Sequence, residues 1–354
     1  MNNLPLPIMW WALKSPTRLL NTMGLFYKYG AALDKIKCYN EKEGLSVPSL
    51  LIISSTSRCN LSCKGCYSKL HSSEGEMTTG QFDKLISQSK EMGVFFYVIA
   101  GGEPFLREDL FDLYAKHKDV VFLIFTNGTL INGEYAEKIA RAGNIAVMLS
   151  IEGFELETDS RRGEKVYEKV LQAMQILKKR DIFFGFSVTV SKENIGVVLA
   201  DKFYNEMTDG GCKMGVYVEY IPCNGIKELV LDPQEQESLR LKVLQRRKNS
   251  KMMIFHLPED EHAFKGKCLS AGSGFLHITS HGFAEPCPFV NYASENIKDK
   301  DFKDIVASPF LRALRDEEAI LEGGSLGCSL FENIEEVKKI AQKHNAINTV
   351  QSSE

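Results

Sequence analysis

The strongest constraint on the fold is an alternation of short apolar segments and helical patterns that starts at residue 50 and recurs about every 30 residues. The apolar segments cover residues 50–55, 94–100, 120–125, 145–151, 183–190 and 213–221. Helical patterns follow at 78–92, 109–116, 133–142, 165–179, 197–207 and 233–248. Continuous Val, Ile and Phe runs indicate strands buried on both faces, which is typical of parallel sheets with helical crossovers. Periodicity alone does not choose between an open sheet and an incomplete barrel.

The nine cysteines are the most informative part of the composition. The first residues lack the charged start, apolar core and cleavage site of a signal peptide, so a cytoplasmic location is expected. Disulfides are rare there, and spaced cysteines are better interpreted as metal ligands or catalytic thiols. A formal net charge of −3 gives no basic field, so no nucleic-acid partner is expected.

Residues 1–48 form a separate N-terminal amphipathic helical segment in this interpretation. Apolar residues, including both tryptophans of the chain (Trp10 and Trp11), alternate there with lysines and arginines. Such a segment can pack on the main domain as an ordinary amphipathic helix. It can also make peripheral contact with a membrane surface or with a greasy substrate. Both alternatives stay open at this point.

Three cysteines follow the first predicted strand closely. Cys59, Cys63 and Cys66 form a C-x3-C-x2-C run in a loop of small and polar residues. Three thiolates can hold three irons of a [4Fe–4S] cube and leave the fourth iron open, whereas electron-transfer cubes usually have four cysteines. Zinc is the structural alternative, but it prefers a closed set of four ligands or three ligands plus water.

This run resembles the signature of the radical S-adenosylmethionine (SAM) superfamily, at that family's usual place after the first strand. The resemblance implies a partial (β/α)6 TIM-like barrel over residues 49–265, a [4Fe–4S] cluster and bound SAM. It also implies reductive cleavage of SAM to a 5′-deoxyadenosyl radical that abstracts a substrate hydrogen, with an external electron donor of the flavodoxin or ferredoxin type. The chain departs from the pattern at Gly65, where relatives often carry an aromatic residue.

Motifs at the ends of later strands support the resemblance. Gly101, Gly102, Glu103 and Pro104 close the second strand and resemble the family's GGEP motif, which binds the methionyl amine of SAM. The alternative interpretation of this motif is an ordinary turn between a strand and a helix. The carboxyl ends of parallel strands are where βα barrels build their sites.

The third, fourth and sixth strands end in further candidates for cofactor binding. Asn127 lies in a TNG sequence like the family's own, and Ser150 ends the fourth strand where relatives carry a similar motif. By resemblance, Arg162 is the candidate for the SAM carboxylate, with Arg161 as its competitor. Glu219 is expected to border the adenine or the substrate.

A second cysteine set lies in a glycine-rich region over residues 266–330. Cys268, Cys287 and Cys328 include a C-x13-G-x4-C spacing that resembles the SPASM or twitch modules of radical SAM enzymes. The resemblance implies an auxiliary [4Fe–4S] cluster, two clusters in all. Three buried structural cysteines are the alternative. The identity of the fourth ligand is left open: it could be Cys223, Cys212 or a side chain other than cysteine, or the fourth iron could have no protein ligand.

Cys223 follows the sixth strand and is the candidate catalytic residue. Its thiol could donate a hydrogen atom to the substrate, or it could simply line the wall of the site. Residues 331–354 are expected to form a C-terminal helix and tail. For function, the resemblance implies a radical SAM enzyme acting on a small-molecule or lipid substrate. A SPASM-type peptide-modifying maturase is one alternative, and a non-catalytic iron–sulfur scaffold or electron carrier is another.

Overall fold

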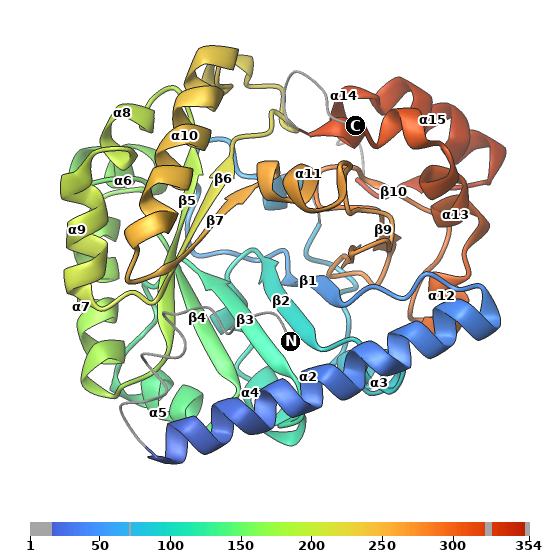
Figure 1. Ribbon diagram of the computed structural model, residues 1–354, viewed down its shortest axis with the longest axis horizontal. Helices are drawn as coiled ribbons and strands as arrows, with labels where there is room; N and C mark the ends of the chain where they lie inside the picture. The colour runs from blue at the N-terminus through green and yellow to red at the C-terminus, as the bar shows by residue number, and fades with distance from the viewer. Residues whose placement is uncertain (1–15, 71, 323–327, 351–354) are drawn as a thin grey trace.

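The computed structural model describes residues 16–70, 72–322 and 328–350, and its centre is one curved, nine-stranded sheet (Figure 1). The strands lie in the order β7-β6-β5-β4-β3-β2-β1-β8-β9, and all neighbours are parallel except β8 and β9. The strands are β1 (Leu50–Thr56), β2 (Phe96–Gly101), β3 (Val121–Thr126), β4 (Ile145–Ser150), β5 (Phe184–Val190), β6 (Met214–Glu219), β7 (Met253–Leu257), β8 (Phe275–Ile278) and β9 (Ala284–Glu285). In the described residues the edges β7 and β9 do not pair with each other, so the sheet is an incomplete barrel.

Helices cover the outer face of this sheet, as the crossovers between parallel strands require. Those of the barrel are α3 (Thr79–Glu91), α4 (Leu110–Lys116), α5 (Gly133–Ala142), α6 (Glu155–Arg162), α7 (Val166–Lys179), α8 (Ile195–Val198), α9 (Asp201–Gly210), α10 (Pro233–Asn249) and α11 (Glu259–Lys265). Capping explains two of the starts: Thr78 and Gln81 form a capping box at α3, and the Asn132 side chain accepts two backbone N–H groups at α5.

All six predicted strands are present, and the α/β partial-barrel prediction is confirmed. The prediction of one helix over 197–207 is wrong, because the chain forms two short helices that separate at Ala200. The strand β7 was not predicted, and its pattern explains why. It alternates buried and exposed positions, with Phe255 39% exposed beside the buried His256, as expected of an edge strand.

The C-terminal part is built around the same sheet. β8 pairs in parallel with β1, so the predicted boundary at residue 265 separates segments that share one sheet. A small second sheet pairs β10 (Tyr292–Ala293) with β11 (Ile347–Asn348), which ties the predicted tail back to the cysteine-bearing region. The helices of this part are α12 (Phe302–Val306), α13 (Pro309–Asp316), α14 (Ser329–Glu332) and α15 (Ile334–Lys343).

The N-terminal helix α2 (Pro16–Glu43) runs along the lower edge of the molecule in Figure 1. Its Tyr29 ring lies 5.4 and 5.3 Å from the rings of Phe95 and Phe96, centroid to centroid, at the amino end of β2. Met23 and Tyr27 are 59% and 81% exposed. The described part of the predicted N-terminal segment therefore packs on the barrel, and its two tryptophans lie outside the described residues.

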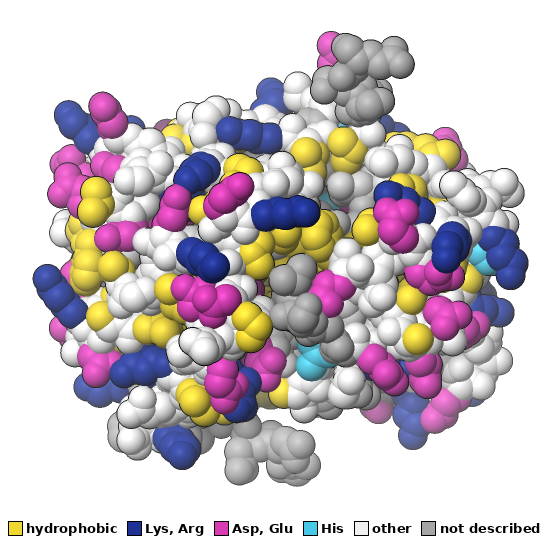
Figure 2. All heavy atoms as spheres, turned by 90° about the horizontal axis from the view of Figure 1, so that it is seen from above, with side chains coloured by type: hydrophobic (Ala, Val, Ile, Leu, Met, Phe, Trp, Pro, Cys, Tyr) yellow, Lys and Arg dark blue, Asp and Glu magenta, His cyan; other side chains and the backbone are white. Residues whose placement is uncertain are grey.

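No helix in the described ranges has both the length and the apolarity needed to cross a bilayer. Acidic and basic side chains are interspersed over the face of the molecule seen in Figure 2, in keeping with the small net charge.

Candidate cofactor site

The cysteine loop leaves the carboxyl end of β1 and lies beside the loops that follow β2, β3 and β4. Cys59 is exposed, Cys63 is buried and Cys66 is partly buried. The Cys59 thiol lies within electrostatic range of the other two, and the Cys66 sulfur is 3.0 Å from the Ser68 hydroxyl. The three thiols predicted as ligands thus belong to one local site.

The donor set fits an iron–sulfur cube better than a single ion. Within the described residues, no group of three or more Cys, His, Asp or Glu side chains is placed to hold one metal ion. In a cube each thiolate binds a different iron, so its three sulfurs lie farther apart than the ligands of one ion. Three thiols on one short loop are compatible with that arrangement.

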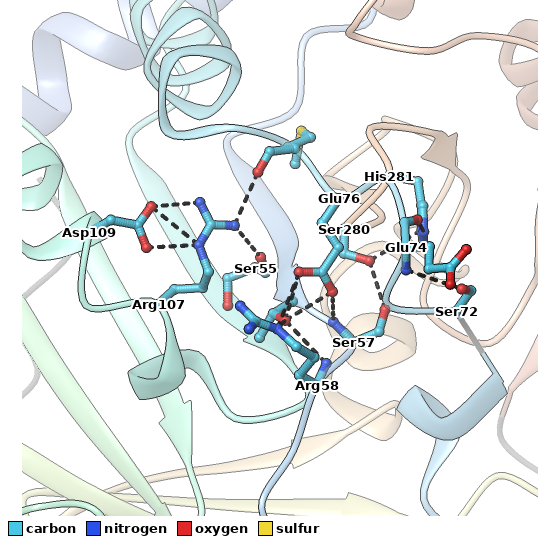
Figure 3. Close-up of polar contacts among 12 residues, drawn as sticks. Ser55, Ser57, Arg58, Ser72, Glu74, Glu76, Arg107, Asp109, Ser280 and His281 are labelled. Atoms are coloured by element: carbon cyan, nitrogen blue, oxygen red, sulfur yellow. Dashed lines mark hydrogen bonds and ion pairs between the residues drawn. The ribbon is translucent and has the colours of Figure 1, made fainter.

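A polar network fixes the chain just before the loop (Figure 3). The Glu76 carboxylate accepts from the Ser57 N–H at 2.6 Å and from the Thr56 hydroxyl at 2.9 Å. The Arg107 guanidinium donates to the Ser55 carbonyl at 3.1 Å, and Asp109 in turn holds Arg107. Ser57 also lies 2.8 Å from Ser280 of the C-terminal part. The approach to Cys59 is therefore held from two sides.

Gly102 has a direct structural reason to be glycine. A Cβ atom at this position would lie 2.0 Å from the Arg58 carbonyl oxygen, so no other residue fits. The Gly102 N–H donates to the Thr56 carbonyl at 2.7 Å, and the Glu103 N–H donates to the Arg58 carbonyl at 2.9 Å. The close backbone approach at this motif is to the segment that carries Cys59.

Glu103 is fully buried and joins two strand ends. Its carboxylate accepts from the Thr126 hydroxyl at 2.7 Å, the Asn127 N–H at 2.8 Å and the Phe105 N–H at 3.0 Å. Burial raises the pKa of Glu103, and these hydrogen bonds oppose the shift. Pro104 follows in the short helix η2 (Pro104–Leu106).

Asn127 connects that network to the first cysteine. Its side-chain amide donates to the Asn60 side chain at 2.8 Å, and the same nitrogen is 3.9 Å from the Cys59 sulfur. The structure thus brings together Glu103, Asn127 and Cys59, which were singled out from motifs far apart in the sequence. Ser150, at the end of β4, is partly buried, and its backbone pairs with Ser187 of β5.

Both candidate arginines lie against one carboxylate that sequence reasoning did not identify as their anchor. Glu152 is 1% exposed, and its Oε1 accepts hydrogen bonds from both Arg161 and Arg162, with Arg162 Nε at 2.8 Å. Two guanidinium groups thus share one buried carboxylate, and Arg162 is also within electrostatic range of Glu103. Burial raises the pKa of the Cys63 thiol, and the positive charge of Arg162 opposes that shift.

A hollow of about 510 Å³ opens between the cysteine loop and the end of α6. Its lining includes Cys59, Lys64, Asp159, Arg161 and Arg162. The Lys64 N–H donates to the Arg161 carbonyl at 2.9 Å, which ties the two walls together. Basic side chains and one acidic side chain beside a thiol suit a cofactor that carries both a carboxylate and an amine.

An aromatic ring covers the position where Gly65 departs from the family pattern. A Cβ at Gly65 would lie 2.9 Å from Cε2 of Tyr220, and Gly65 has a φ of +73°. Tyr220 follows β6, is 4% exposed, and donates its hydroxyl to Asn224 at 2.5 Å. The cysteine loop therefore has an aromatic neighbour from a distant segment, which the sequence alone did not identify.

The last candidates from the sixth strand have different surroundings. Glu219 is buried, and its oxygens lie 2.8 Å from His256 Nε2 and 2.9 Å from Gln236 Nε2. Cys223 is partly buried within electrostatic range of Cys66. Burial raises the pKa of its thiol to about 11.

The second cysteine set also converges. Cys268, Cys287 and Cys328 are all buried, and each thiol is within electrostatic range of at least one of the other two. Between the two sets, the Tyr67 ring next to Cys66 meets the Phe289 ring edge-on, with centroids 5.9 Å apart. The two groups of thiols therefore belong to neighbouring sites.

A buried histidine, which was not among the candidate site residues, links β1 to this second region. His277 of β8 lies 2.8 Å from the Ser54 hydroxyl through Nε2 and 2.7 Å from Glu285 through Nδ1. His277 and Glu285 are fully buried. This contact joins the strand that leads to Cys59 to the strand pair that leads to Cys287.

Comparisons with known proteins identify related sequences and a shared fold. Residues 53–199 match the sequence model described as the Radical SAM superfamily. The chain is 28% identical to an AdoMet-dependent heme synthase of Methanosarcina barkeri over 78% of this chain and 87% of the relative. It is 27% identical to an AdoMet-dependent heme synthase of Oleidesulfovibrio alaskensis, over 74% and 76%.

The solved structures of Streptococcus suis SuiB share the fold. With S-adenosylmethionine bound, SuiB superposes with a TM-score of 0.66 at 18% identity, over 84% of this chain and 75% of SuiB. With the precursor peptide SuiA bound, the TM-score is 0.65 at 17% identity, over 83% and 73%.

Proposed function

We propose that this chain, a radical SAM enzyme whose catalytic domain includes residues 53–199, binds a [4Fe–4S] cluster through Cys59, Cys63 and Cys66 and abstracts a hydrogen from a small-molecule substrate. The observation that carries the proposal is the convergence of Cys59, Glu103 and Asn127 from three strand ends. When bound, the cluster and SAM supply one electron and a carbon-centred radical able to break a C–H bond.

The chain's own residues hold and orient SAM. Glu103, whose oxygens already accept three hydrogen bonds, has remaining lone pairs for the methionyl amine. The guanidinium groups of Arg161 and Arg162, which line the hollow beside Cys59, suit the carboxylate of SAM. Asn127 keeps Asn60, and with it the first cysteine, in place.

The second cysteine set, Cys268, Cys287 and Cys328, holds the auxiliary cluster in this proposal. The electron for the first cluster comes from an external donor of the flavodoxin or ferredoxin type. α2 offers exposed apolar side chains, Met23 and Tyr27 among them, for peripheral contact with a membrane.

For substrate, a tetrapyrrole is the first small molecule to test, because two relatives that match most of this chain are named heme synthases. A peptide is the competing class, because SuiB has been solved with a precursor peptide, although that likeness concerns the fold alone.

The test is anaerobic reconstitution with iron and sulfide. The wild-type chain is expected to hold about eight irons, two cubes, and Cys59→Ala about half of them. Cys38→Ala is the matched control, because Cys38 is exposed on α2 at the opposite end of the barrel. With dithionite, the wild type and the control should release 5′-deoxyadenosine from SAM, and Cys59→Ala should not.

Transfer of deuterium from a labelled tetrapyrrole or a labelled peptide into 5′-deoxyadenosine then identifies the substrate class. A reconstituted wild type that binds iron but leaves SAM intact under dithionite contradicts the proposed function. Four irons in the wild type contradict the auxiliary cluster alone.

A further inference from the structure

The second cysteine set supplies three thiols from three separate segments. Cys268 follows α11, Cys287 follows β9, and Cys328 precedes α14. The Cys268 N–H donates to the Leu321 carbonyl at 2.9 Å. His262 of α11 lies 3.3 Å from Ser329 of α14, which ties the helix that carries Glu261 to the segment that carries Cys328.

None of the remaining cysteines completes this set. Cys223 lies near Cys66 of the first site. Cys212 is buried in the core ahead of β6, at the amino end of the barrel, and Cys38 is exposed on α2. All nine cysteines of the chain are within the described residues, so a fourth protein ligand has to be another kind of side chain.

Glu261 has the right position for that role. Its Oε2 lies 3.7 Å from the Cys268 sulfur and accepts the Leu269 N–H at 3.1 Å. In the described part of the chain, Oε1 accepts no hydrogen bond, and Glu261 forms no salt bridge with a basic side chain. Its neighbour Asp260, in contrast, pairs with Arg247 at 2.5 Å.

The negative charge of Glu261 acts on all three thiols. Burial is the main reason that the pKa of Cys268 rises to about 11 and that those of Cys287 and Cys328 rise well above their usual range. The charge of Glu261 adds to each of these shifts. The carboxylate therefore lies near all three sulfurs, and its direct contact with them is the 3.7 Å approach to Cys268.

We propose that Glu261 is the fourth ligand of an iron–sulfur cluster held by Cys268, Cys287 and Cys328, an inference that rests on the auxiliary cluster of the proposed function. A partly buried carboxylate beside three buried thiols, with no salt bridge to a basic side chain among the described residues, is unfavourable by itself. Iron ions offset that cost, because they accept the carboxylate oxygen and the three thiolate sulfurs. Clusters tolerate ligands other than cysteine, and the ligand's charge changes the reduction potential.

A purely structural role for Glu261 makes a different prediction. Its carboxylate could simply hold the loop after Cys268 through the Leu269 N–H. Glu261→Gln separates the two roles, because the amide oxygen still accepts that N–H but the negative ligand is lost. Glu261→Cys restores an anionic ligand of another kind.

The experiment uses the full chain with Cys59, Cys63 and Cys66 all changed to Ala, so that only the auxiliary site can hold iron. Into this background go Glu261→Gln, Glu261→Cys and, as the control from the same helix, Glu259→Gln. Each protein is reconstituted anaerobically. Its iron content, its EPR spectrum in the oxidised and reduced forms, and its midpoint potential are measured.

The background and the Glu259→Gln control are expected to hold about four irons. Glu261→Gln should lose about one iron and give a three-iron EPR signal on oxidation, or keep four irons at a more positive potential. Glu261→Cys should keep four irons with an altered spectrum. A Glu261→Gln protein with the background's iron content, spectrum and potential overturns the assignment.

A measurement on the unchanged side chain covers the case in which Glu261→Gln does not fold. Protein grown with ¹³C-labelled glutamate should show a carboxylate ¹³C coupling to the reduced cluster in pulsed EPR, and its absence overturns the assignment. If the triple-alanine background holds no iron, the inference fails, while SAM cleavage by the wild type still tests the proposed function separately.

Discussion

Glu152→Gln is the substitution whose effect follows most directly from the structure. The carboxylate is 1% exposed, and the side chains of Arg161 and Arg162 are each 12% exposed. The glutamine oxygen can still accept one hydrogen bond from an arginine, but the negative charge is lost. The amide N–H₂ also replaces the Oε2 acceptor that receives the Thr189 N–H at 3.1 Å.

Removing one partner of a buried ion pair costs about 3–5 kcal/mol in the free energy of unfolding, because the remaining charge stays buried and uncompensated. Two guanidinium groups are left here, whereas the glutamine keeps some hydrogen bonding, so we expect about 3 kcal/mol or more. Unfolding entropy of about 2.1 cal/mol/K per residue then translates 3–5 kcal/mol into a Tm lower by about 4–7 °C for a chain of 354 residues.

The assay is thermal unfolding of the iron-free protein by circular dichroism, so that cluster loss does not contribute. Glu193→Gln is the control, because Glu193 forms an exposed pair with Lys64 at 2.5 Å in the same neighbourhood. Such a surface pair contributes about 0–1 kcal/mol, so the control should keep the wild-type Tm within about 1 °C. Equal Tm values for Glu152→Gln and the control would show that the buried pair is not the anchor described here.

Two further predictions concern the surroundings of the cysteine loop. Gly65→Ala should destabilise the chain by about 1–2 kcal/mol because Gly65 has a positive φ, and by more because the new Cβ clashes with the Tyr220 ring. In a Tyr220→Ala background only the cost of the positive φ remains, so a double-mutant cycle measured by urea unfolding should be non-additive. Additive effects would mean that the ring does not press on Gly65. The Arg107 guanidinium lowers the pKa of Asp109 to about 2, so this ion pair stabilises the fold above the ordinary pKa of about 4, and its stabilisation is lost as the pH falls toward 2. Asp109→Asn should therefore lower the Tm of the iron-free protein at pH 6 but not at pH 2. A difference in Tm that does not shrink on acidification would contradict this.

The strands that carry the site could be predicted because their sequences satisfy the rule for doubly buried strands. The segments of β1 to β6 are mostly apolar runs, and polar or glycine residues lie at or just after the end of each. The carboxyl ends of parallel strands meet at one edge, so Glu103 and Asn127 could be placed near Cys59 before any coordinates were considered.

The contacts that complete the site could not be predicted in this way, because the sequence around these residues does not indicate which partners they contact. Glu152 was visible as part of a strand-end motif, but nothing in its spacing indicates that it holds both arginines. Tyr220 fits equally well as a wall residue or as a cover for Gly65. Glu261 is one acidic residue among three at the start of a short helix, and only the fold shows that Asp260 turns toward Arg247 while Glu261 turns toward Cys268.

The pairing of β8 with β1 was not expected, and it explains how the two cysteine sets come to be neighbours. Because β8 runs parallel to β1, with Ile278 beside Ile53, the chain leaves both strands at the same edge of the sheet. The following loops then meet through Ser57 and Ser280. The boundary inferred from composition at residue 265 therefore lies between segments that share one sheet. A substitution that breaks the β1–β8 contact, such as one at buried His277, should therefore disturb both cysteine sites together.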